Sequence, residues 1–392
     1  NIYYYNSFSL KSKGIKDTDL RGIIEINLKN LNENLNYFKK NLPRGARLAA
    51  VVKADAYGHG AVGVVKAIRE KVDYFVTASA EEAEEVRELT KKSILCLAAL
   101  SESEATRCML KGIEISVSSE SDVRMLAAIS ERTGVCAYVH ICADTGMNRM
   151  GIKGEKPAYR LINGVLSCKN LSIKGVYSHF FDCSDKGKTG KQFAAFCKVA
   201  KLVPQNAVRH IAATEGFFDK NYVLDMVRIG IGLYGYGEQK PQGATKAPKH
   251  AAGKLKPVMS LKSYVARVAK IKKGETVGYG GRFEAAEDCY VATVSAGYGD
   301  GVPRSFTGGN VLIGGKKRKI VGNICMDFCF ALADKNVKAG DEVVFFGRQG
   351  DEILTAEDMA DACGTISYEI LTGVKRYERV YINRDGKIKQ EI

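Results

Sequence analysis

The sequence of 392 residues has no tryptophan, no Cys-x-x-Cys pair and no apolar run long enough to span a membrane. Cys325 and Cys329 have a spacing that could serve a metal, but no second pair of cysteines or histidines completes such a site. Residues 1–6 lack the basic region and apolar core of a signal peptide. Eleven cysteines, an odd number in a long chain, favour free thiols, so we expect a reduced cytoplasmic protein with no metal.

The formal net charge of +15 is large and would suit a partner such as nucleic acid or an anionic surface. However, the lysines are scattered over helix-like segments, without zinc-finger spacing, an RNA-binding aromatic signature or a basic repeat. We therefore expect neither nucleic acid nor a membrane as a partner. The charge favours solubility or the attraction of anionic small molecules.

The length exceeds that of a usual single core, so we expect two domains after an extension at residues 1–20. Within residues 21–255, strand-like runs alternate with helix-like segments. Ser79 with Glu82, and Ser101 with Glu104, have the spacing of capping boxes at helix starts. About eight such units favour a closed (β/α)8 barrel over an open sheet. The predicted strands are Arg47–Lys53, Val72–Ala78, Ser93–Ala98, Ile113–Ser118, Val135–Cys142, Ile173–His179, Val208–Ala212 and Val227–Tyr234.

The pattern changes after Tyr236–Lys256, which is rich in glycine and proline and is typical of a connector. Residues 256–392 contain short strand-like runs separated by glycine-rich turns, and one helix predicted from the cap Thr355 to Cys363. We therefore predict a C-terminal domain that is mainly β. Its strands are expected at Val258–Ile271, Cys289–Ser295, Val311–Ile313, Arg318–Val321, Phe328–Leu332 and Glu342–Phe346.

One stretch carries the clearest chemical signal. An apolar run ends at Lys53, and Tyr57, Gly58, His59 and Gly60 follow. A lysine at the end of a buried strand is costly to desolvate, but a lowered pKa allows its amine to form a Schiff base with a carbonyl cofactor. The alternative is a solvated lysine that ends an ordinary strand. The glycines favour the first reading, because they permit close approach of a ligand.

The segment Val51–Gly60 resembles the pyridoxal-phosphate attachment motif of the alanine racemase family, and the similarity continues from about Arg21 to Tyr381. The resemblance implies an isomerase that interconverts L- and D-alanine through an aldimine with pyridoxal 5'-phosphate. It also implies a cytoplasmic homodimer with shared active sites that supplies D-alanine for peptidoglycan. Lys53 would be the base on one face of the substrate, and Tyr298 from the partner subunit the base on the other.

Tyr298 lies in a segment, Ser295–Arg304, that is similar to the one holding the family's tyrosine base. A free tyrosine titrates near pH ~10, so this role needs a neighbour that favours the ionised form or a proton relay. The alternative is a turn tyrosine between two strands. Met326 resembles the position whose backbone N–H binds the substrate carboxylate, although a core methionine would look the same.

Arg228 matches the family arginine that faces the pyridine nitrogen of the cofactor. An arginine does not deliver a proton at ordinary pH, so the ring nitrogen would stay unprotonated and transamination would be disfavoured. The backbone N–H groups of Gly230 and Ile231 would cradle the phosphate. His210 matches the histidine that braces this arginine, with a buried structural histidine as the alternative.

The remaining expected site residues also come from the resemblance. Thr214 aligns with a serine that binds phosphate, and the preceding family asparagine is Ala213 here. His179 resembles the histidine near the cofactor ring. Arg149 matches the arginine that binds the phenolic oxygen and reaches toward the substrate carboxylate. Cys142 stands where many members have a carbamylated lysine that steers this arginine.

Tyr57 and Tyr368 match two family tyrosines that lie at the edge of the phosphate site. Tyr368 also narrows the pocket beside the substrate side chain, which favours alanine as the substrate. A serine or broad-specificity racemase is the nearest alternative, because Ala213 and Cys142 depart from the family pattern. An amino-acid decarboxylase of the ornithine type would need a carboxylate at the pyridine nitrogen, and Arg228 argues against it. A non-catalytic pyridoxal-phosphate carrier would not need Tyr298 or a second domain.

Overall fold

The computed structural model describes residues 21–237, 254–383 and 388–389. The predicted extension at residues 1–20 and most of the predicted connector at 236–256 lie outside these ranges. The chain divides into two compact units. We call residues 32–56 and 64–256 the barrel unit, and residues 1–31, 57–63 and 257–392 the β unit. Within the described residues, no helix combines the length and the apolar content needed to cross a membrane.

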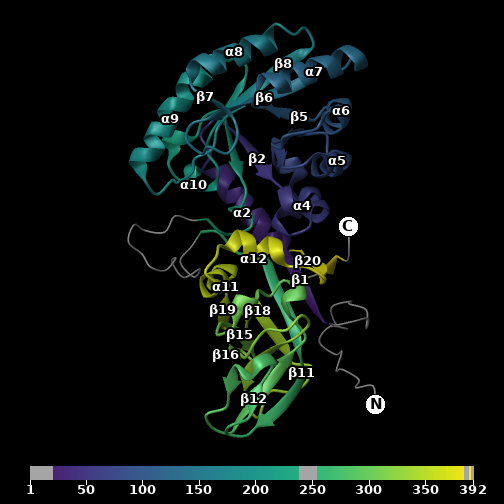
Figure 1. Cartoon of the computed structure of the whole chain (residues 1–392), viewed down its shortest axis with the longest axis vertical. Coiled ribbons are helices and arrows are strands. Elements are labelled where there is room, and N and C mark those ends of the chain that lie inside the picture. The colour runs from purple at the N-terminus through teal and green to yellow at the C-terminus, as the bar shows by residue number, and fades with distance from the viewer. Residues whose placement is uncertain (1–20, 238–253, 384–387, 390–392) are drawn as a thin grey trace. The chain divides into compact units, whose positions relative to one another are not determined.

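The barrel unit is built on eight parallel strands in the order β10-β2-β3-β4-β5-β6-β8-β9, and the short β7 pairs with β6. Figure 1 labels β2, β5, β6, β7 and β8 of this sheet. Backbone hydrogen bonds from Asp225 N to Arg209 O and from Arg228 N to Ala212 O, both 3.1 Å, join the β9 and β10 stretches. The (β/α)8 prediction is therefore confirmed. The strands are β2 Arg47–Val51, β3 Tyr74–Thr77, β4 Ser93–Cys96, β5 Glu114–Val117, β6 Ala137–Asp144, β7 Ile152–Lys153, β8 Leu171–Tyr177, β9 Val208–His210 and β10 Met226–Ile229.

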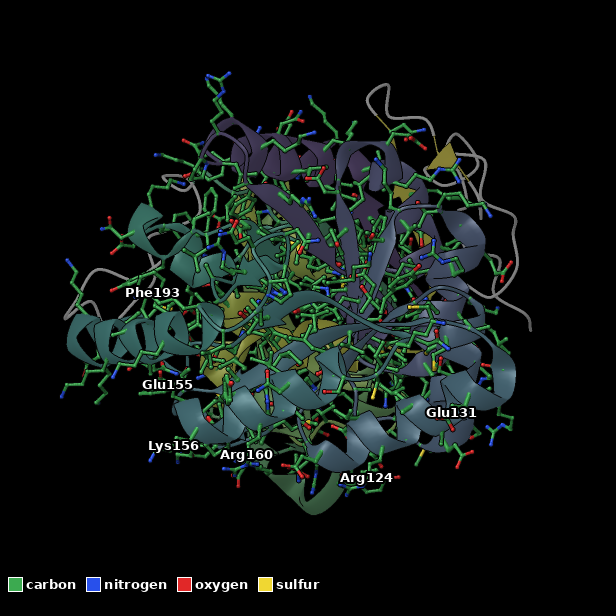
Figure 2. All side chains as sticks on the ribbon, turned by 90° about the horizontal axis from the view of Figure 1, so that it is seen from above. Arg124, Glu131, Glu155, Lys156, Arg160 and Phe193 are labelled. Atoms are coloured by element: carbon green, nitrogen blue, oxygen red, sulfur yellow. The ribbon has the colours of Figure 1, made fainter. Side chains whose placement is uncertain are left out.

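Helices follow most of these strands because apolar residues recur at helical spacing behind good caps. Ser101 and Glu104 form the predicted capping box, and one face of α7 buries Val123, Leu126 and Ser130. Figure 2 shows charged side chains such as those of Arg124 and Glu131 on the outer side of the same helix. The helices are α2 Leu28–Lys40, α4 Ala61–Ile68, η1 Arg69–Lys71, α5 Ala80–Leu89, α6 Glu102–Leu110, α7 Glu120–Thr133, α8 Glu155–Leu166, α9 Lys186–Ala200, α10 Thr214–Phe217 and η2 Lys220–Tyr222. The segment labelled α3, Lys53–Tyr57, is a left-handed turn.

The β unit is mainly β, which confirms that prediction, and the structure adds that six of its strands form an antiparallel barrel. The strands β18, β15, β16, β17, β14 and β11 pair in this order, and an additional pairing of β18 with β11 closes the ring. The strands β1, β20, β21 and β19 flank it, and β12 pairs with β13. The strands are β1 Gly22–Asn27, β11 Met259–Ile271, β12 Thr276–Val277, β13 Phe283–Glu284, β14 Cys289–Val294, β15 Asn310–Ile313, β16 Lys316–Val321, β17 Cys329–Ala333, β18 Glu342–Gln349, β19 Glu352–Leu354, β20 Glu378–Ile382 and β21 Ile388–Lys389.

Two features of the β unit differ from the sequence-based expectation. The strand β1 lies within residues 21–255, the range predicted for the barrel, but it pairs with β11 and β20 in the β unit. The helix α11 Ala356–Cys363 has the predicted cap Thr355, but it is followed by an unpredicted helix, α12 Ser367–Gly373. Short 3-10 turns occur at η4 Tyr279–Gly281, η5 Tyr298–Asp300 and η6 Arg304–Phe306.

Candidate active site

Lys53 stands at the start of a left-handed turn. Ala54, Asp55 and Ala56 have φ of 51–54° and ψ of 49–52°, and Tyr57 continues with φ 55°. Left-handed backbone costs an L-residue roughly 1–2 kcal/mol, so four such residues in succession need support from their surroundings. Ala56 N donates to Val52 O at 2.8 Å, and Ala54 N donates to Glu82 Oε1 at 2.6 Å. The turn therefore depends on a side chain from the helix after the next strand.

The Glu82 carboxylate differs from its predicted role. Ser79 Oγ accepts from Glu82 N at 3.2 Å, which is one half of the predicted capping box. The other half is absent, because the carboxylate accepts from Ala78 N at 2.9 Å and from Ala54 N instead. The capping-box prediction for Ser79 and Glu82 was therefore wrong in its second half. Through the hydrogen bond from Ala54 N, Glu82 connects α5 with the turn that begins at Lys53.

The amine of Lys53 is half-buried, and burial is the main cause that lowers its pKa. The positive charge of Arg149 lowers this pKa further, and the carboxylate of Glu82 opposes both effects. A lowered pKa increases the fraction of neutral amine, which is the form that attacks a carbonyl group and accepts a proton.

Arg228 is the centre of a buried polar cluster at the end of β10. Its Nη1 donates to His210 Nδ1 at 2.5 Å and to His210 O at 3.1 Å. Its Nη2 donates to Ser178 O at 2.7 Å, to Ile211 O at 3.2 Å and to His179 Nδ1 at 3.3 Å. Within the described residues no carboxylate forms an ion pair with this guanidinium, which is only 3% exposed. Burial lowers the pKa of Arg228 to about 10, so it stays charged at neutral pH.

The two histidines beside Arg228 are neutral at ordinary pH. Burial, followed by the charges of Arg228, Arg149 and Lys53, lowers the pKa of His179 to about 3. Burial and then Arg228 and His140 lower the pKa of His210 well below its ordinary value. Neutral imidazoles can each accept one hydrogen bond from the guanidinium, as the observed contacts require.

The turn after β10 has the geometry of an anion cradle. Gly230 and Ile231 are buried, and their N–H groups donate to no group in the described part of the chain. Thr214 Oγ1 accepts from Gly232 N at 3.2 Å, and a Cβ atom on Gly232 would lie 2.8 Å from Thr214 Cγ2. Buried N–H groups without partners next to a hydroxyl favour an anion such as a phosphate group.

Cys142 lies on β6, and Arg149 lies in the loop after this strand. Arg149 is exposed and makes no hydrogen bond or ion pair with other described residues, but its charge acts on Lys53 and His179. The Cys142 thiol is buried, its pKa is raised by that burial, and it contacts Met150 O at 3.7 Å. Cys142 therefore supplies no acceptor that steers Arg149 in this structure.

The β unit brings the other predicted residues together in two pairs. The rings of Tyr57 and Tyr368 lie 6.0 Å apart between centroids. Tyr298 N donates to Cys325 O at 3.0 Å, and Gly299 N donates to Met326 O at 2.9 Å. The side chains of Tyr298 and Met326 are 46% and 55% exposed. The second pair is therefore available to another molecule.

Sequence reasoning missed three polar residues around the Arg228 cluster, Glu114, His140 and Tyr177, and it gave Glu82 only a capping role. The Tyr177 ring stacks on that of His210 at 5.4 Å and 12°, and the Arg228 guanidinium lies 5.5 Å from its centre. Glu114 and His140 stand inside otherwise apolar strand runs. A charged or polar residue in such a run is the signal that could have identified them.

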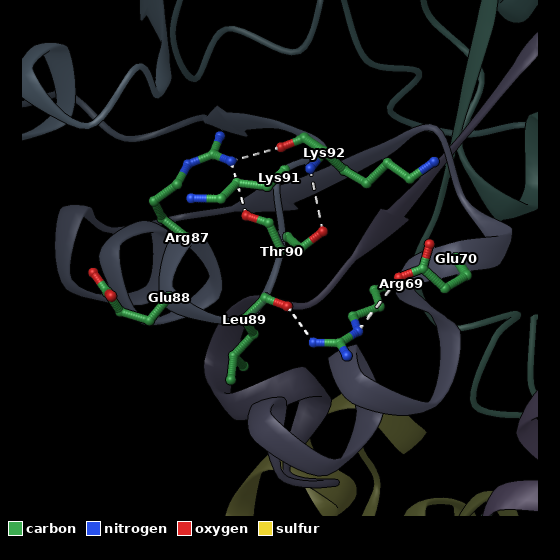
Figure 3. A pocket seen from close by; sticks show the side chains of 8 residues that line it. All are labelled: Arg69, Glu70, Arg87, Glu88, Leu89, Thr90, Lys91 and Lys92. Carbon is green, nitrogen blue, oxygen red and sulfur yellow. Dashed lines mark hydrogen bonds and ion pairs between the residues drawn. The ribbon is translucent and has the colours of Figure 1, made fainter.

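A cavity of about 530 Å³ lies outside the cluster and is lined by η1, the end of α5 and the following loop (Figure 3). The guanidinium groups of its two arginines donate hydrogen bonds to backbone carbonyls. Arg69 donates to Leu89 O at 2.7 Å, and Arg87 donates to Thr90 O and Lys92 O at 3.0 Å each (Figure 3). None of the predicted site residues lines it. Among the described residues, no group of three or more His, Cys, Asp or Glu side chains is placed to hold a metal.

Comparisons with known proteins agree with the resemblance. Residues 26–238 match the family model for the alanine racemase N-terminal domain, and residues 258–381 match that for the C-terminal domain. The alanine racemase of Methanococcus maripaludis is 32% identical over 371 residues, 92% of this chain and 98% of that protein.

Solved structures show the same similarity. The alanine racemase of Clostridium difficile 630 has a TM-score of 0.86 at 32% identity, over 95% of this chain and 98% of that one. The Bartonella henselae alanine racemase, solved with covalently bound pyridoxal phosphate, has a TM-score of 0.82 at 28% identity, over 93% of this chain and all of that one. This chain belongs to the alanine racemase family of pyridoxal-phosphate-dependent amino-acid racemases.

Proposed function

We propose that this protein interconverts L-alanine and D-alanine, with Lys53 and the partner subunit's Tyr298 as bases on opposite faces of the substrate. The observation that supports it most is the buried Arg228 cluster, which has hydrogen-bond donors and no carboxylate in direct contact. An enzyme of the decarboxylase type needs a carboxylate at this position. The cluster instead suits a reaction in which a proton returns to the carbon it left.

The residues of the barrel unit fit pyridoxal phosphate. The N–H groups of Gly230 and Ile231 and the hydroxyl of Thr214 would hold the phosphate. Arg228 would face the ring nitrogen, and because it stays charged it donates a hydrogen bond without giving up its proton. When bound, the cofactor acidifies the Cα proton of the amino acid by delocalising negative charge. By the family resemblance, Tyr57 and Tyr368 are further proposed residues of the phosphate site.

Lys53 would remove or return the proton on one face, since its lowered pKa favours the neutral amine. The exposure of Tyr298 and Met326 supports a homodimer in which each chain completes the site of the other. Arg149 would bind the phenolic oxygen and reach toward the substrate carboxylate, and the backbone of Met326 would bind that carboxylate. Tyr368 would narrow the space beside the substrate side chain and favour alanine. We further propose that the enzyme acts in the cytoplasm and supplies D-alanine for peptidoglycan.

The test incubates the purified protein and pyridoxal phosphate with L-alanine, and separately with L-serine, in deuterated water. Loss of optical activity and Cα deuteration are followed together. The proposal expects fast loss with L-alanine and little with L-serine. Comparable rates would favour the broad-specificity alternative, for which Cys142 and Ala213 are the observed departures. No exchange with either amino acid would contradict a racemase.

The two-base part is tested by Tyr298→Phe, with Tyr279→Phe as the matched control. Tyr279 is an exposed tyrosine of the β unit, at 75% exposure, and has no proposed role. Tyr298→Phe should reduce proton exchange from one face by ~10²-fold or more while the cofactor still binds. Tyr279→Phe should leave both rates unchanged. Loss of cofactor binding in Tyr298→Phe alone would contradict a base role for that hydroxyl.

A further inference from the structure

A line of buried polar side chains runs through the interior of the barrel unit, from the first residue of β5 to β10. Glu114 Oε2 lies 2.7 Å from His140 Nε2, and His140 Nδ1 lies 2.9 Å from His210 Nε2. His210 Nδ1 in turn lies 2.5 Å from Arg228 Nη1. The four residues are 0–6% exposed. Three hydrogen bonds therefore connect a carboxylate near the amino ends of the strands with a guanidinium near their carboxyl ends.

The direction of these hydrogen bonds follows from the chemistry of the end groups. A guanidinium only donates, so His210 Nδ1 must accept from Arg228. A neutral His210 then carries its proton on Nε2 and donates it to His140 Nδ1. A neutral His140 likewise carries its proton on Nε2, where the Glu114 carboxylate accepts it. A single arrangement of protons satisfies all three contacts, and it needs an acceptor at Glu114.

Packing holds the two imidazoles in place. A Cβ atom on Gly175 would lie 2.4 Å from His140 Nδ1, so only glycine leaves room for this ring at that point of β8. The strands β6 and β8 also shift register between Val139 and His140. The ring of Tyr177 stacks on His210, and its hydroxyl lies 2.7 Å from Ser116 Oγ. The rings are thus positioned by contacts that do not involve a cofactor.

Cationic side chains lie around Glu114. Glu114 lines a cavity of about 470 Å³ together with the cations Arg87, Lys111 and Lys174, among others. Burial lowers the pKa of Arg87, and the negative charge of Glu114 opposes that effect. Glu114 therefore has these cations on one side and the imidazole of His140 on the other. The carboxylate therefore serves as a counter-charge for Arg228 at a distance of two imidazole rings.

We propose that Glu114 is a positioning residue for Arg228, which acts by fixing the proton arrangement of His140 and His210. By accepting from His140 it leaves His210 Nδ1 free to accept from the guanidinium, which sets the direction of the remaining donors of Arg228. The inference deepens the proposed function, because its kinetic consequence rests on Arg228 facing the cofactor. The proton arrangement itself does not depend on the reaction.

The test measures the ring protonation of His140 and His210 in the full chain with pyridoxal phosphate, by two-bond proton–nitrogen correlation NMR with labelled histidine. Assignments come from His140→Gln and His210→Gln. Wild type should show both rings neutral with the proton on Nε2 at pH ~7.5, above the ordinary histidine pKa. Glu114→Met removes the acceptor and should abolish this pattern in His140. Glu114→Gln retains an acceptor oxygen and should preserve it.

Glu88→Met is the matched control, because Glu88 is an exposed glutamate of the same unit that pairs with Lys111 at 2.8 Å. It should leave both histidines as in wild type. In kinetics, Glu114→Met should lower kcat for alanine by roughly tenfold with little change in KM, and Glu114→Gln should restore most of that loss.

A proton on Nδ1 of His140 in wild type, or an imidazolium, would overturn the inference whether or not the protein racemises alanine. A Glu114→Met protein with wild-type histidines and wild-type kcat would also overturn it. The expected NMR pattern in a protein without racemase activity would support the proton arrangement and contradict the proposed function, so the two failures are distinguishable.

Discussion

Glu82 Oε1 accepts a hydrogen bond of 2.6 Å from the backbone N–H of Ala54, the residue that follows Lys53. The same carboxylate accepts from Ala78 N through its other oxygen at 2.9 Å. One side chain therefore supports both the left-handed turn and the chain leading into α5. A turn whose backbone is unfavourable by itself depends on such external partners.

We predict that Glu82→Ala lowers the free energy of unfolding by about 2 kcal/mol, because two backbone donors lose a charged acceptor. Glu82→Gln should lose roughly half as much, since its amide oxygen replaces one acceptor and its NH2 group faces the other donor. Denaturant unfolding measures both. The exposed Glu85 on the same helix is the control, and Glu85→Ala should change stability little. An equal loss of unfolding free energy in Glu82→Ala and Glu85→Ala would contradict a special role for Glu82.

Ala54→Gly should stabilise the protein. Ala54 is exposed and has φ 51°, so glycine would remove left-handed strain of ~1 kcal/mol or more while adding some entropy to the unfolded chain. We expect a net gain of about 0.5 kcal/mol in the free energy of unfolding. Ala67→Gly in the right-handed helix α4 is the matched control and should lose about 1 kcal/mol. The same sign for both substitutions would show that the turn carries no strain.

The pKa of His179, lowered to about 3 from 6.5, predicts a dependence of stability on pH. Between these values the unfolded chain binds a proton at His179 that the native chain does not. Stability is therefore complete above pH ~6.5 and falls as the pH decreases toward ~3, by up to about 1.4 kcal/mol per pH unit for this one group. His179→Gln should reduce the slope of the free energy of unfolding against pH by the amount that corresponds to about one proton. Unfolding curves from pH ~4.5 to ~6.5 measure it, and identical slopes would contradict the prediction.

Gly175→Ala should destabilise the barrel unit by about 2 kcal/mol, because its Cβ would lie 2.4 Å from His140 Nδ1 and 2.7 Å from Val208 O. Gly190 in α9 is the matched control, since nothing lies within 4 Å of a Cβ placed there. Gly190→Ala should instead raise stability by up to about 1 kcal/mol through helix propensity. Thermal unfolding of the two variants separates these effects. A neutral Gly175→Ala would mean that His140 can move aside.

The barrel strands could be predicted because each is a short apolar run bounded by caps and turns, and every predicted run overlaps a strand. The strand β1 has the same appearance, so its apolar pattern could not show that its partners are β11 and β20, far along the chain. The helix α12 was missed because it is short and Ile366, which precedes it, provides no side-chain cap.

The site was predictable only in part. A lysine after an apolar run indicated the position of Lys53, but nothing in Ala54-Asp55-Ala56 indicates positive φ, because no glycine is present. The capping spacing of Glu82 suggested a local role, whereas its carboxylate meets a turn 28 residues away. Glu114 and His140 became meaningful only when the sheet order placed β5 beside β6 and brought β9 within reach.

The line of polar residues inside the barrel also limits how its sequence can change. Removing Glu114 alone leaves a buried guanidinium without its distant counter-charge, and replacing Arg228 alone leaves a buried carboxylate facing two imidazoles. Each single apolar substitution should therefore lower the free energy of unfolding by more than the joint replacement of all four residues does. The four positions form one epistatic unit, so a stabilising redesign of this interior has to exchange them jointly or leave them intact.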